Sequence, residues 1–570
     1  MKNTIVADIF RGIAELLEIK GDNPFRIRAY VRAAENIERL KDDIEEYVQQ
    51  DRLTEIAGVG QDLANKIKEI VQTGTCKHYE ELKKLIPEGV MKLLEIPSVG
   101  PKTAKLFYDR LKIGSLEALE KAAKEDRLLG LPGVQQKTVD NILKGIELIK
   151  KGKERMDLLT ATTISEGILS ELKKIKGVQK ISVAGSLRRM KDTVRDIDIL
   201  VVSKNAKKVS DAFISLPQVK RVLAEGETKS SLLTKEDVQV DMRVLDSKSF
   251  GAALLYFTGS KNHNIKLRQL AIKRGLKINE YGIFDRKDHR VASETEEDIY
   301  HYLGLDYIEP ELREGAGEIE AALKHQLPAL LELKNIKGDF HVHTDYSDGK
   351  DSIEDLARAA MGLGYEYVCL TDHSVSLKVA RGLDLARLKK KKKELDKVNR
   401  KLKNFRILFG SEVEIGSDGK IDYKDDILSQ FDVVVAAIHS GFKQSQKQLT
   451  MRIVKACQNK NVHIIAHPTG KLWPTRGPYE VDFKEIFKVA QETNTALEIN
   501  AHPYRLDLSD VNGRWARDSG VRLVIGTDSH SMSHLEYMKF GVGLARRAWL
   551  QKGDVLNSLK LNALLKVIKK

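Results

Sequence analysis

The sequence has few cysteines, and the three it has form no pairing pattern. Cys76, Cys369 and Cys457 are scattered over 570 residues. This excludes a disulfide framework and fits a reducing compartment. Long apolar runs are also missing, since no stretch has the length of a signal-peptide core or a transmembrane helix. We therefore expect a soluble, cytoplasmic protein with no membrane partner.

The chain also lacks an excess of acidic residues. Its 96 lysines and arginines outnumber 82 aspartates and glutamates, which gives a formal net charge of +14. A basic chain favours a polyanionic partner, although charge alone does not distinguish nucleic acid from an anionic membrane surface. The length exceeds that of one compact domain and indicates three or four. We expect the protein to act as a monomer.

Two alternating segments in the middle of the chain carry paired carboxylates. The run from Asp196 through Asp198 alternates polar and apolar residues, which predicts a strand with both aspartates on one face. A second alternating strand carries Asp241. Three carboxylates suit Mg²⁺, which prefers oxygen ligands. They are enough to hold two ions roughly 4 Å apart, an arrangement that supports phosphoryl transfer.

Gly185 and Ser186 precede these strands and predict a tight turn after an apolar run. With Arg189, this turn is suited to hold the polyphosphate of a nucleotide. Gly-Ser, Arg-Arg, Asp-x-Asp and a later lone Asp together resemble the palm of the family X, DNA polymerase β-like nucleotidyltransferases. The resemblance implies a template-directed DNA polymerase that binds dNTPs, gapped or nicked DNA and Mg²⁺, and that fills short gaps in repair.

A Tyr-Phe-Thr-Gly run further along matches the nucleotide-selecting segment of the same family. Tyr256, Phe257 and Gly259 belong to this run, and Asn264 and Arg268 follow at the family's spacing. The resemblance implies that the run lies against the nascent base and sugar. It also implies that Asn264 meets the minor-groove edge of the incoming base and that Arg268 meets the template strand.

A glycine-containing pattern recurs in the first part of the chain. Its copies span residues 53–67, 93–106 and 128–139. Gly58 and Gly60 mark the first copy and Gly100 the second, whereas the weaker third copy has Gln135. The copies resemble the helix-hairpin-helix motif, which presents backbone N–H groups to a DNA phosphate. Such contacts carry no sequence information.

Lys66 lies in the first copy at a position with two open interpretations. In the polymerase β resemblance, this copy belongs to a lyase domain whose lysine forms a Schiff base with an abasic-site sugar. Such a lysine must be neutral to react. Asp62 stands where polymerase β has another lysine, and this opposes neutralisation. The alternative is that Lys66 binds phosphate.

The last part of the chain is rich in histidine. Nine of the fourteen histidines lie beyond residue 336, most of them at the ends of short β-branched runs that alternate with helical segments. This alternation indicates a (β/α) barrel with polar residues at one mouth. We count seven strands and expect an irregular barrel. So many converging polar groups would be costly without metals, and the mixture of imidazole and carboxylate suits Zn, Mn or Fe.

The pattern resembles the polymerase and histidinol phosphatase (PHP) domain. The resemblance implies up to three Mn²⁺ or Zn²⁺ ions and a 3′→5′ exonuclease, and it allows an abasic-site endonuclease. It implies nine metal ligands: His341, His343, Asp348, His373, Glu412, His439, His467, Asp528 and His530. His463 is left out because it faces the other side of its strand, and His502 and His534 stay unassigned. The run Lys389 to Lys393 is predicted to form a solvated helix face.

These observations predict a multidomain fold. We expect a helical helix-hairpin-helix region, an α+β nucleotidyltransferase palm and a C-terminal irregular (β/α)7, TIM-like PHP barrel. The expected segments are 1–80 (lyase-like), 81–150 (DNA-binding), 151–245 (palm), 246–315 (nucleotide-selecting), 316–335 (helical linker) and 336–570 (PHP nuclease). Two alternatives remain open. One is a template-independent nucleotidyltransferase, and the other is a PHP nuclease or phosphatase whose palm only binds DNA.

Overall fold

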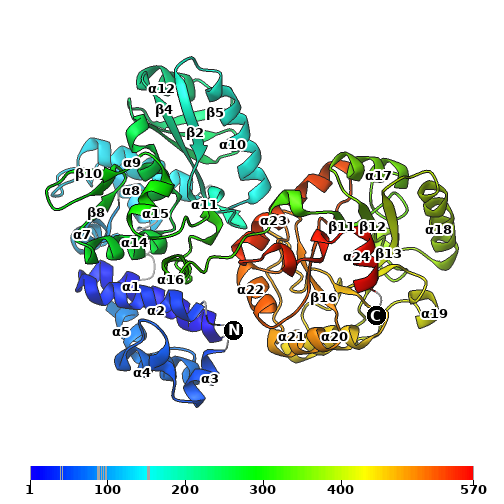
Figure 1. Ribbon diagram of the computed structural model, residues 1–570. Coiled ribbons are helices and arrows are strands. Elements are labelled where there is room, and N and C mark those ends of the chain that lie inside the picture. Colours follow the sequence, from blue (N-terminus) through cyan, green and yellow to red (C-terminus); the bar gives the residue numbers. More distant parts are fainter. Residues whose placement is uncertain are drawn as a thin grey trace. The chain divides into compact units, whose positions relative to one another are not determined.

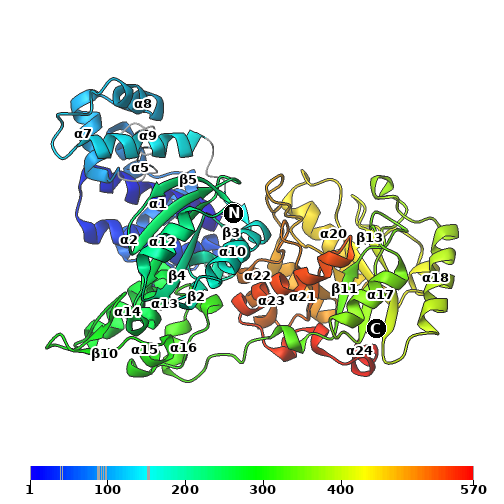
Figure 2. The same cartoon turned by 90° about the horizontal axis from the view of Figure 1, so that it is seen from above.

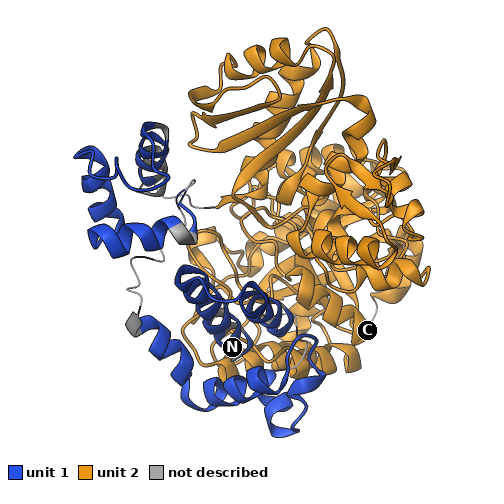
Figure 3. Ribbon diagram, turned by 90° about the vertical axis from the view of Figure 1, so that its left-hand side faces the viewer, with its two compact units in different colours: residues 1–154 blue, residues 155–570 orange. Residues whose placement is uncertain are grey.

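The computed structural model describes residues 2–38, 40, 43–85, 90, 93, 96, 99–150 and 155–568. The chain divides into two compact units, Met1–Glu154 and Arg155–Lys570, which Figure 3 colours separately. Among the described residues, no helix is both long and apolar enough to cross a lipid bilayer.

The first unit is helical over its described residues. A break at residues 21–23 separates its first two helices, because Pro24 can open a helix but cannot continue one. Phe10 and Tyr30 pack edge to face across these two helices, with 5.4 Å between ring centroids. The helices are α1 (Lys2–Lys20), α2 (Pro24–Glu38), α3 (Ile44–Gln49), η1 (Leu53–Glu55), α4 (Gln61–Thr73), α5 (Lys77–Leu85), α7 (Pro101–Leu111), α8 (Leu116–Lys124) and α9 (Gln136–Lys150).

The three repeated segments share one local structure, a turn that leads directly into a helix. Helices α4, α7 and α9 begin at the residues that follow Gly60, Gly100 and Gln135. A buried valine precedes each of these positions, and its N–H donates to the carbonyl three residues earlier; the valines are Val59, Val99 and Val134. Pro97 and Ser98 of the second copy lie outside the described residues. The predicted helical region is confirmed.

The second unit opens with a five-stranded sheet, the predicted palm. The strand order is β2–β4–β7–β6–β5, and only β4 and β7 run parallel. Burial alternates at the start of β4 and along β7, as the polar–apolar alternation of the sequence predicts. The elements are β1 (Met156–Asp157), α10 (Leu158–Lys173), β2 (Val178–Val183), α11 (Gly185–Arg188), β3 (Thr193–Val194), β4 (Asp196–Ser203), α12 (Ala206–Ile214), β5 (Val219–Ala224), β6 (Lys229–Thr234) and β7 (Gln239–Leu245).

A smaller helical region with its own core follows the palm sheet. Leu255, Leu267 and Ile299 pack together in this core. The expected helical linker over residues 316–335 is helical only in α16 and in a short 3-10 turn, η5 (Leu333–Asn335). The other elements are η3 (Ser247–Ser249), α13 (Phe250–Thr258), α14 (Lys261–Lys273), β8 (Lys277–Asn279), β9 (Gly282–Phe284), β10 (Arg290–Ala292), α15 (Glu296–Tyr302), η4 (Pro310–Leu312) and α16 (Glu318–Leu323).

Seven parallel strands then form a barrel in chain order, β11 to β17. A parallel bridge between Val342 and Ser529 joins the first strand to the segment after the last. Figures 1 and 2 show α17 and α18 outside the strands. The strands are β11 (Gly338–Val342), β12 (Tyr367–Leu370), β13 (Arg406–Glu414), β14 (Val433–Ala437), β15 (Ile464–Ile465), β16 (Ala496–Asn500) and β17 (Leu523–Gly526). The predicted irregular barrel of seven strands is confirmed.

The helices of the barrel alternate with its strands. They are α17 (Ile353–Gly362), η6 (Lys378–Ala380), α18 (Leu385–Asn399), α19 (Asp425–Leu428), α20 (Gln446–Gln458), α21 (Phe483–Glu492), α22 (Asp510–Asp518), η7 (Met532–Tyr537), α23 (Met538–Arg547), η8 (Lys552–Asp554), η9 (Leu556–Ser558) and α24 (Leu561–Val567).

Two local predictions need correction. Gly185 and Ser186 form the first turn of the short helix α11 rather than a simple turn. The lysine run on α18 is not solvated throughout, because Lys391 is fully buried. Its Nζ lies 2.8 Å from Asp372 and donates to the carbonyls of Leu370 and Gly410, so it neutralises a buried carboxylate.

Candidate functional site

The three palm aspartates lie on the adjacent strands β4 and β7. Asp198 and Asp241 are direct partners in the parallel register, and Asp196 lies two residues before Asp198 on the same face. Burial, together with the charges of Asp196 and Asp241, raises the pKa of Asp198 to about 7. Crowded carboxylates with a raised pKa are the electrostatic situation that a divalent cation relieves.

Gly185 lies directly against this cluster. Its φ is +63°, and a Cβ atom there would lie 2.4 Å from Oδ2 of Asp198. The N–H of Ala184 donates to the carbonyl of Asp198 at 2.8 Å, which fixes the backbone beside the strand. Ser186 follows in α11 and is half-buried. The sequence thus brings the Gly-Ser pair and the carboxylates together.

Arg189 is held by protein groups. Its Nε donates to Glu314 at 2.9 Å, and its guanidinium also donates to the carbonyl of Thr258. Arg188 pairs instead with Glu296, which also pairs with the buried Arg313. Sequence analysis missed these glutamates because each lies more than a hundred residues from the Arg-Arg pair. Arg189 would have to leave Glu314 to bind a triphosphate.

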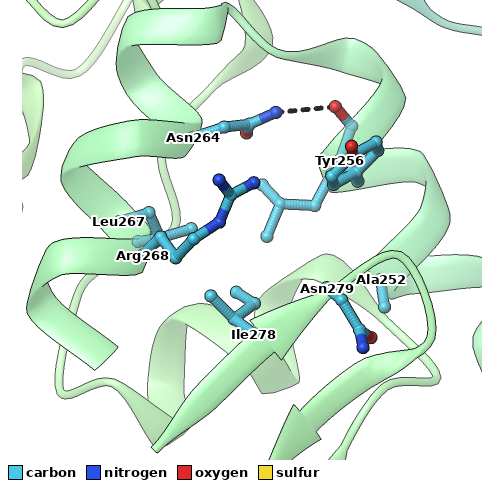
Figure 4. Close-up of a pocket in the computed structure, with 8 residues that line it drawn as sticks. Ala252, Tyr256, Asn264, Leu267, Arg268, Ile278 and Asn279 are labelled. Carbon is cyan, nitrogen blue, oxygen red and sulfur yellow. Dashed lines mark hydrogen bonds between the residues drawn. The ribbon is translucent and has the colours of Figure 1, made fainter. Parts of the chain in front are cut away.

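Three of the five predicted nucleotide-selecting residues line one pocket between α13, α14 and β8. Figure 4 shows Tyr256, Asn264 and Arg268 around it. The amide of Asn264 donates to the carbonyl of Tyr256 at 2.7 Å. Phe257 points elsewhere, because its ring lies beneath the guanidinium of Arg243, 4.4 Å from the centroid. Gly259 has a φ of +70° at the end of α13 and precedes a cis peptide bond.

In the first unit, Lys66 forms an ion pair with Asp62. The distance between Nζ and Oδ1 is 2.6 Å, and Lys66 is the more buried partner. This contact holds Nζ of Lys66 against a carboxylate. Gly58 has a φ of +84°, which the turn before α4 requires. A Cβ at Gly60 or Gly100 would meet no atom of the described residues within 4 Å. The two hairpin glycines are therefore open to close approach by a ligand.

The nine residues predicted as PHP ligands all lie at one end of the barrel strands. Glu412 is central, because its carboxylate lies within 3.5 Å of five imidazoles. These belong to His341, His343, His373, His439 and His467. Asp348 lies 3.5 Å from His373 and 3.4 Å from His530, and Asp528 lies 3.3 Å from His343.

The side chains form three overlapping groups with the spacing of metal ligands. The groups are His343, Asp348, His373 and His530; His341, His343 and Asp528; and His373, Glu412 and His439. Several buried polar atoms of the cluster have no hydrogen-bond partner among the residues that the structure describes. They include Nε2 of His341, both ring nitrogens of His343 and Oε2 of Glu412. Leaving such atoms unpaired is costly, so this donor set fits bound divalent metal ions.

The pKa values of two histidines in this cluster are shifted in opposite directions. Burial opposes protonation of His341, but Glu498, Glu412 and Asp528 outweigh it and raise its pKa well above the ordinary value. Burial and the neighbouring His530 lower the pKa of His343 to about 4. His343 is therefore neutral near pH 7, as a metal-ligating imidazole must be.

Three residues that sequence analysis missed support the predicted ligands. Glu498 accepts a hydrogen bond from Nδ1 of His341 at 2.7 Å, and Glu414 lies 2.9 Å from Nδ1 of His439. Arg505 donates to Asp528 at 2.9 Å. Carboxylates that hold the second nitrogen of a ligating imidazole fix its orientation. Their signal in the sequence was a glutamate inside an otherwise apolar strand.

Comparisons with known proteins match four segments of the chain. Family models match a helix-hairpin-helix domain at residues 1–76, a SAM-like helix-hairpin-helix tandem at 90–147, a DNA polymerase beta thumb at 253–314 and a PHP domain at 339–502. A probable phosphatase of Thermoanaerobacter sp. (strain X514) is 27% identical over 231 residues, 39% of this chain and 89% of its own. Rat DNA polymerase lambda is 24% identical over 345 residues, 55% of this chain and 56% of its own.

One relative matches nearly the whole chain. The DNA polymerase/3′-5′ exonuclease PolX of Bacillus subtilis (strain 168) is 39% identical over 552 residues, which is 96% of each chain. The thumb model, the helix-hairpin-helix models and the PHP model fall in the segments where the fold has the corresponding architecture. The chain therefore belongs to the family X DNA polymerases that carry a C-terminal PHP domain.

Proposed function

We propose that this chain is a template-directed DNA polymerase that fills short gaps during repair and that its PHP domain removes nucleotides from DNA 3′ ends. One observation carries the proposal. The same chain has a carboxylate cluster on β4 and β7 and a separate cluster of the nine predicted metal ligands at the barrel mouth. Eight of these nine have the spacing of metal ligands, and His467 contacts Glu412 beside them. The Bacillus subtilis relative is named for both activities.

In the palm, Asp196, Asp198 and Asp241 would hold Mg²⁺. Ions bound there supply charge neutralisation for the attacking 3′-hydroxyl and for the departing pyrophosphate. The contributions of the chain are positional. Gly185 and Ser186 form the first turn of α11 beside the carboxylates, and Asn264 and Arg268 line the pocket between α13, α14 and β8.

In the PHP domain, the nine-residue cluster would hold Mn²⁺ or Zn²⁺. Metal ions there lower the pKa of water and neutralise the leaving oxygen of a phosphodiester. Glu498 and Glu414 orient the imidazoles of His341 and His439 for this purpose. The buried position of these groups excludes bulk water from most of the cluster.

The helix-hairpin-helix segments would bind the DNA backbone on either side of a gap. At the starts of α4 and α7, no described side chain caps the helix, and phosphate binds at such helix starts without regard to sequence. Neutralised phosphates release counterions, so gap binding should weaken steeply as salt rises.

The test uses a 5′-labelled primer at a one-nucleotide gap with Mn²⁺ and dNTPs. Wild type, Asp198→Ala and His341→Ala are compared, with the exposed residues Asp211→Ala and His325→Ala as matched controls. We expect wild type to extend and shorten the primer, Asp198→Ala only to shorten it, and His341→Ala only to extend it. Extension by Asp198→Ala would refute the palm assignment. Extension without a template strand would favour a template-independent transferase.

A further inference from the structure

The nine-residue PHP cluster is open on one side. The side chains of Asp348 and His530 are 32% and 29% exposed, whereas those of His341 and Glu412 are 1% exposed. A phosphodiester must therefore approach past Asp348 and His530. The side chains that border His530 decide what else of the DNA is held there.

Four aromatic side chains, which we call the aromatic rim, lie beside this opening. They are His502, Tyr504, His534 and Tyr537. The N–H of His530 donates to Nδ1 of His534 at 3.3 Å. Asn500 joins the other side, because its amide donates to Asp528 at 3.2 Å and its oxygen accepts from the N–H of His502 at 3.0 Å. One hydrogen bond thus connects the rim to His530, and two hydrogen bonds through Asn500 connect it to Asp528.

The rings of the aromatic rim contact one another. The ring centroid of His502 lies 5.4 Å from that of Tyr504 and 5.3 Å from that of Tyr537. His534 stacks on Tyr537 at 4.7 Å with an interplanar angle of 21°. The rings therefore support one another. They still leave part of the rim accessible to solvent, since Tyr504 is 41% exposed.

The backbone beneath Tyr504 is fixed. The N–H groups of Arg505 and Leu506 both donate to the carbonyl of His502, at 2.8 and 3.0 Å, and the N–H of Trp473 donates to the carbonyl of Tyr504 at 2.7 Å. An exposed ring on a fixed backbone loses little conformational entropy when it stacks on a ligand.

We propose that the aromatic rim stacks on the base of the 3′-terminal nucleotide of single-stranded DNA while the metal cluster holds its phosphodiester. The inference rests on the proposed 3′→5′ exonuclease. A phosphate site beside aromatic rings is the usual arrangement for binding single strands without base preference. A base stacked on Tyr504 has left its partner strand, so a paired end must fray before it is cut.

The first test measures variants of Tyr504 on two substrates that differ at the 3′ end. Oligonucleotides end in thymidine or in a base-free tetrahydrofuran residue, and wild type is compared with Tyr504→Ala and Tyr504→Phe. The exposed Tyr302→Ala is the matched control. Loss of one stacked base corresponds to a rise in KM of about tenfold. We expect this rise for Tyr504→Ala on the thymidine end, with kcat little changed, and no rise on the tetrahydrofuran end. Tyr504→Phe should match wild type.

Equal losses on both ends would overturn the proposal and leave Tyr504 a purely structural role. Unchanged kinetics of Tyr504→Ala on thymidine ends would overturn it as well. A measurement without turnover separates this inference from the exonuclease itself. With 2-aminopurine at a 3′ end protected by a phosphorothioate linkage, stacking quenches fluorescence in wild type and Tyr504→Phe. Equal quenching in Tyr504→Ala would refute the rim, whereas a wild type that quenches but never cuts would refute only the proposed nuclease.

Discussion

Gly185 touches the carboxylate of Asp198 so closely that no side chain fits between them. A Cβ at Gly185 would lie 2.4 Å from Oδ2 of Asp198, and the φ of +63° is one that other residues rarely adopt. The glycine therefore determines where the central palm carboxylate stands relative to α11.

Gly185→Ala should slow synthesis selectively. Displacement of a reacting group by about 1 Å costs about 10²-fold in rate, so we expect primer extension to fall by that factor while 3′→5′ degradation stays at the wild-type rate. Gly362→Ala is the control, because a Cβ there meets no atom within 4 Å and α17 tolerates alanine. Full extension activity in Gly185→Ala would contradict the contact.

The raised pKa of Asp198 predicts how stability depends on pH in metal-free protein. The pKa is about 7 in the folded chain against 3.8 ordinarily, so the folded state holds its proton more tightly. Stability is then lost as pH rises from about 4 to 7. Asp198→Asn removes this loss, and its melting temperature should exceed that of wild type by several degrees at pH 8.5 but not at pH 4.

Calorimetry in EDTA measures this difference, with the exposed Asp211→Asn as control. Mg²⁺ should reduce the difference in melting temperature between Asp198→Asn and wild type at pH 8.5, because Mg²⁺ stabilises wild type but not the variant. If Asp198→Asn raised the melting temperature equally at pH 4 and pH 8.5, repulsion among the three carboxylates could not be the cause of the stabilisation.

Glu498 should determine metal retention in the PHP domain. It accepts from Nδ1 of His341 and from the N–H of His467, both at 2.7 Å. Loss of such a partner typically weakens metal affinity by about 10- to 100-fold. Glu498→Gln should therefore lose metal on dialysis and lose exonuclease in proportion, with polymerase retained. Mass spectrometry measures the bound metal, and Glu492→Gln on the surface of α21 is the control that should retain metal as wild type does. Unchanged metal content in Glu498→Gln would exclude a role of Glu498 in metal retention.

The ion pair between Lys66 and Asp62 should limit any lyase reaction at Lys66. A Schiff base needs an amine that is free to attack the sugar, and Asp62 holds Nζ of Lys66 at 2.6 Å. Asp62→Asn should raise the fraction of enzyme trapped by borohydride on abasic DNA several-fold over wild type. Lys66→Arg should abolish trapping while leaving gap binding intact. Trapping that survives Lys66→Arg would assign the chemistry to another amine.

The sequence was most informative where the chemistry is local. Asp196 and Asp198 alternate with isoleucines, and this period alone predicted their shared face on β4. The histidines at strand ends predicted the barrel because each strand–helix unit repeats one short pattern. Neither inference needed a contact between distant residues.

Features that depend on distant partners could not be predicted. Glu314 holds Arg189 across 125 residues, and nothing near either residue indicates the pair. Lys391 looks like any member of a lysine run, yet only it meets a buried aspartate. Glu498 is a single polar residue within a strand pattern, and its role becomes apparent only from its contact with His341 in the fold.

The bridge between Val342 and Ser529 gives the two activities an order of appearance. His341 and His343 come from the first barrel strand, whereas Asp528 and His530 follow the last one. Domains generally fold as units while the chain emerges from the ribosome. The palm strands are therefore complete before the barrel can close. A nascent chain interrupted before β17 holds every carboxylate for synthesis but only part of the cluster for degradation, so the ribosome completes the nuclease cluster after the palm.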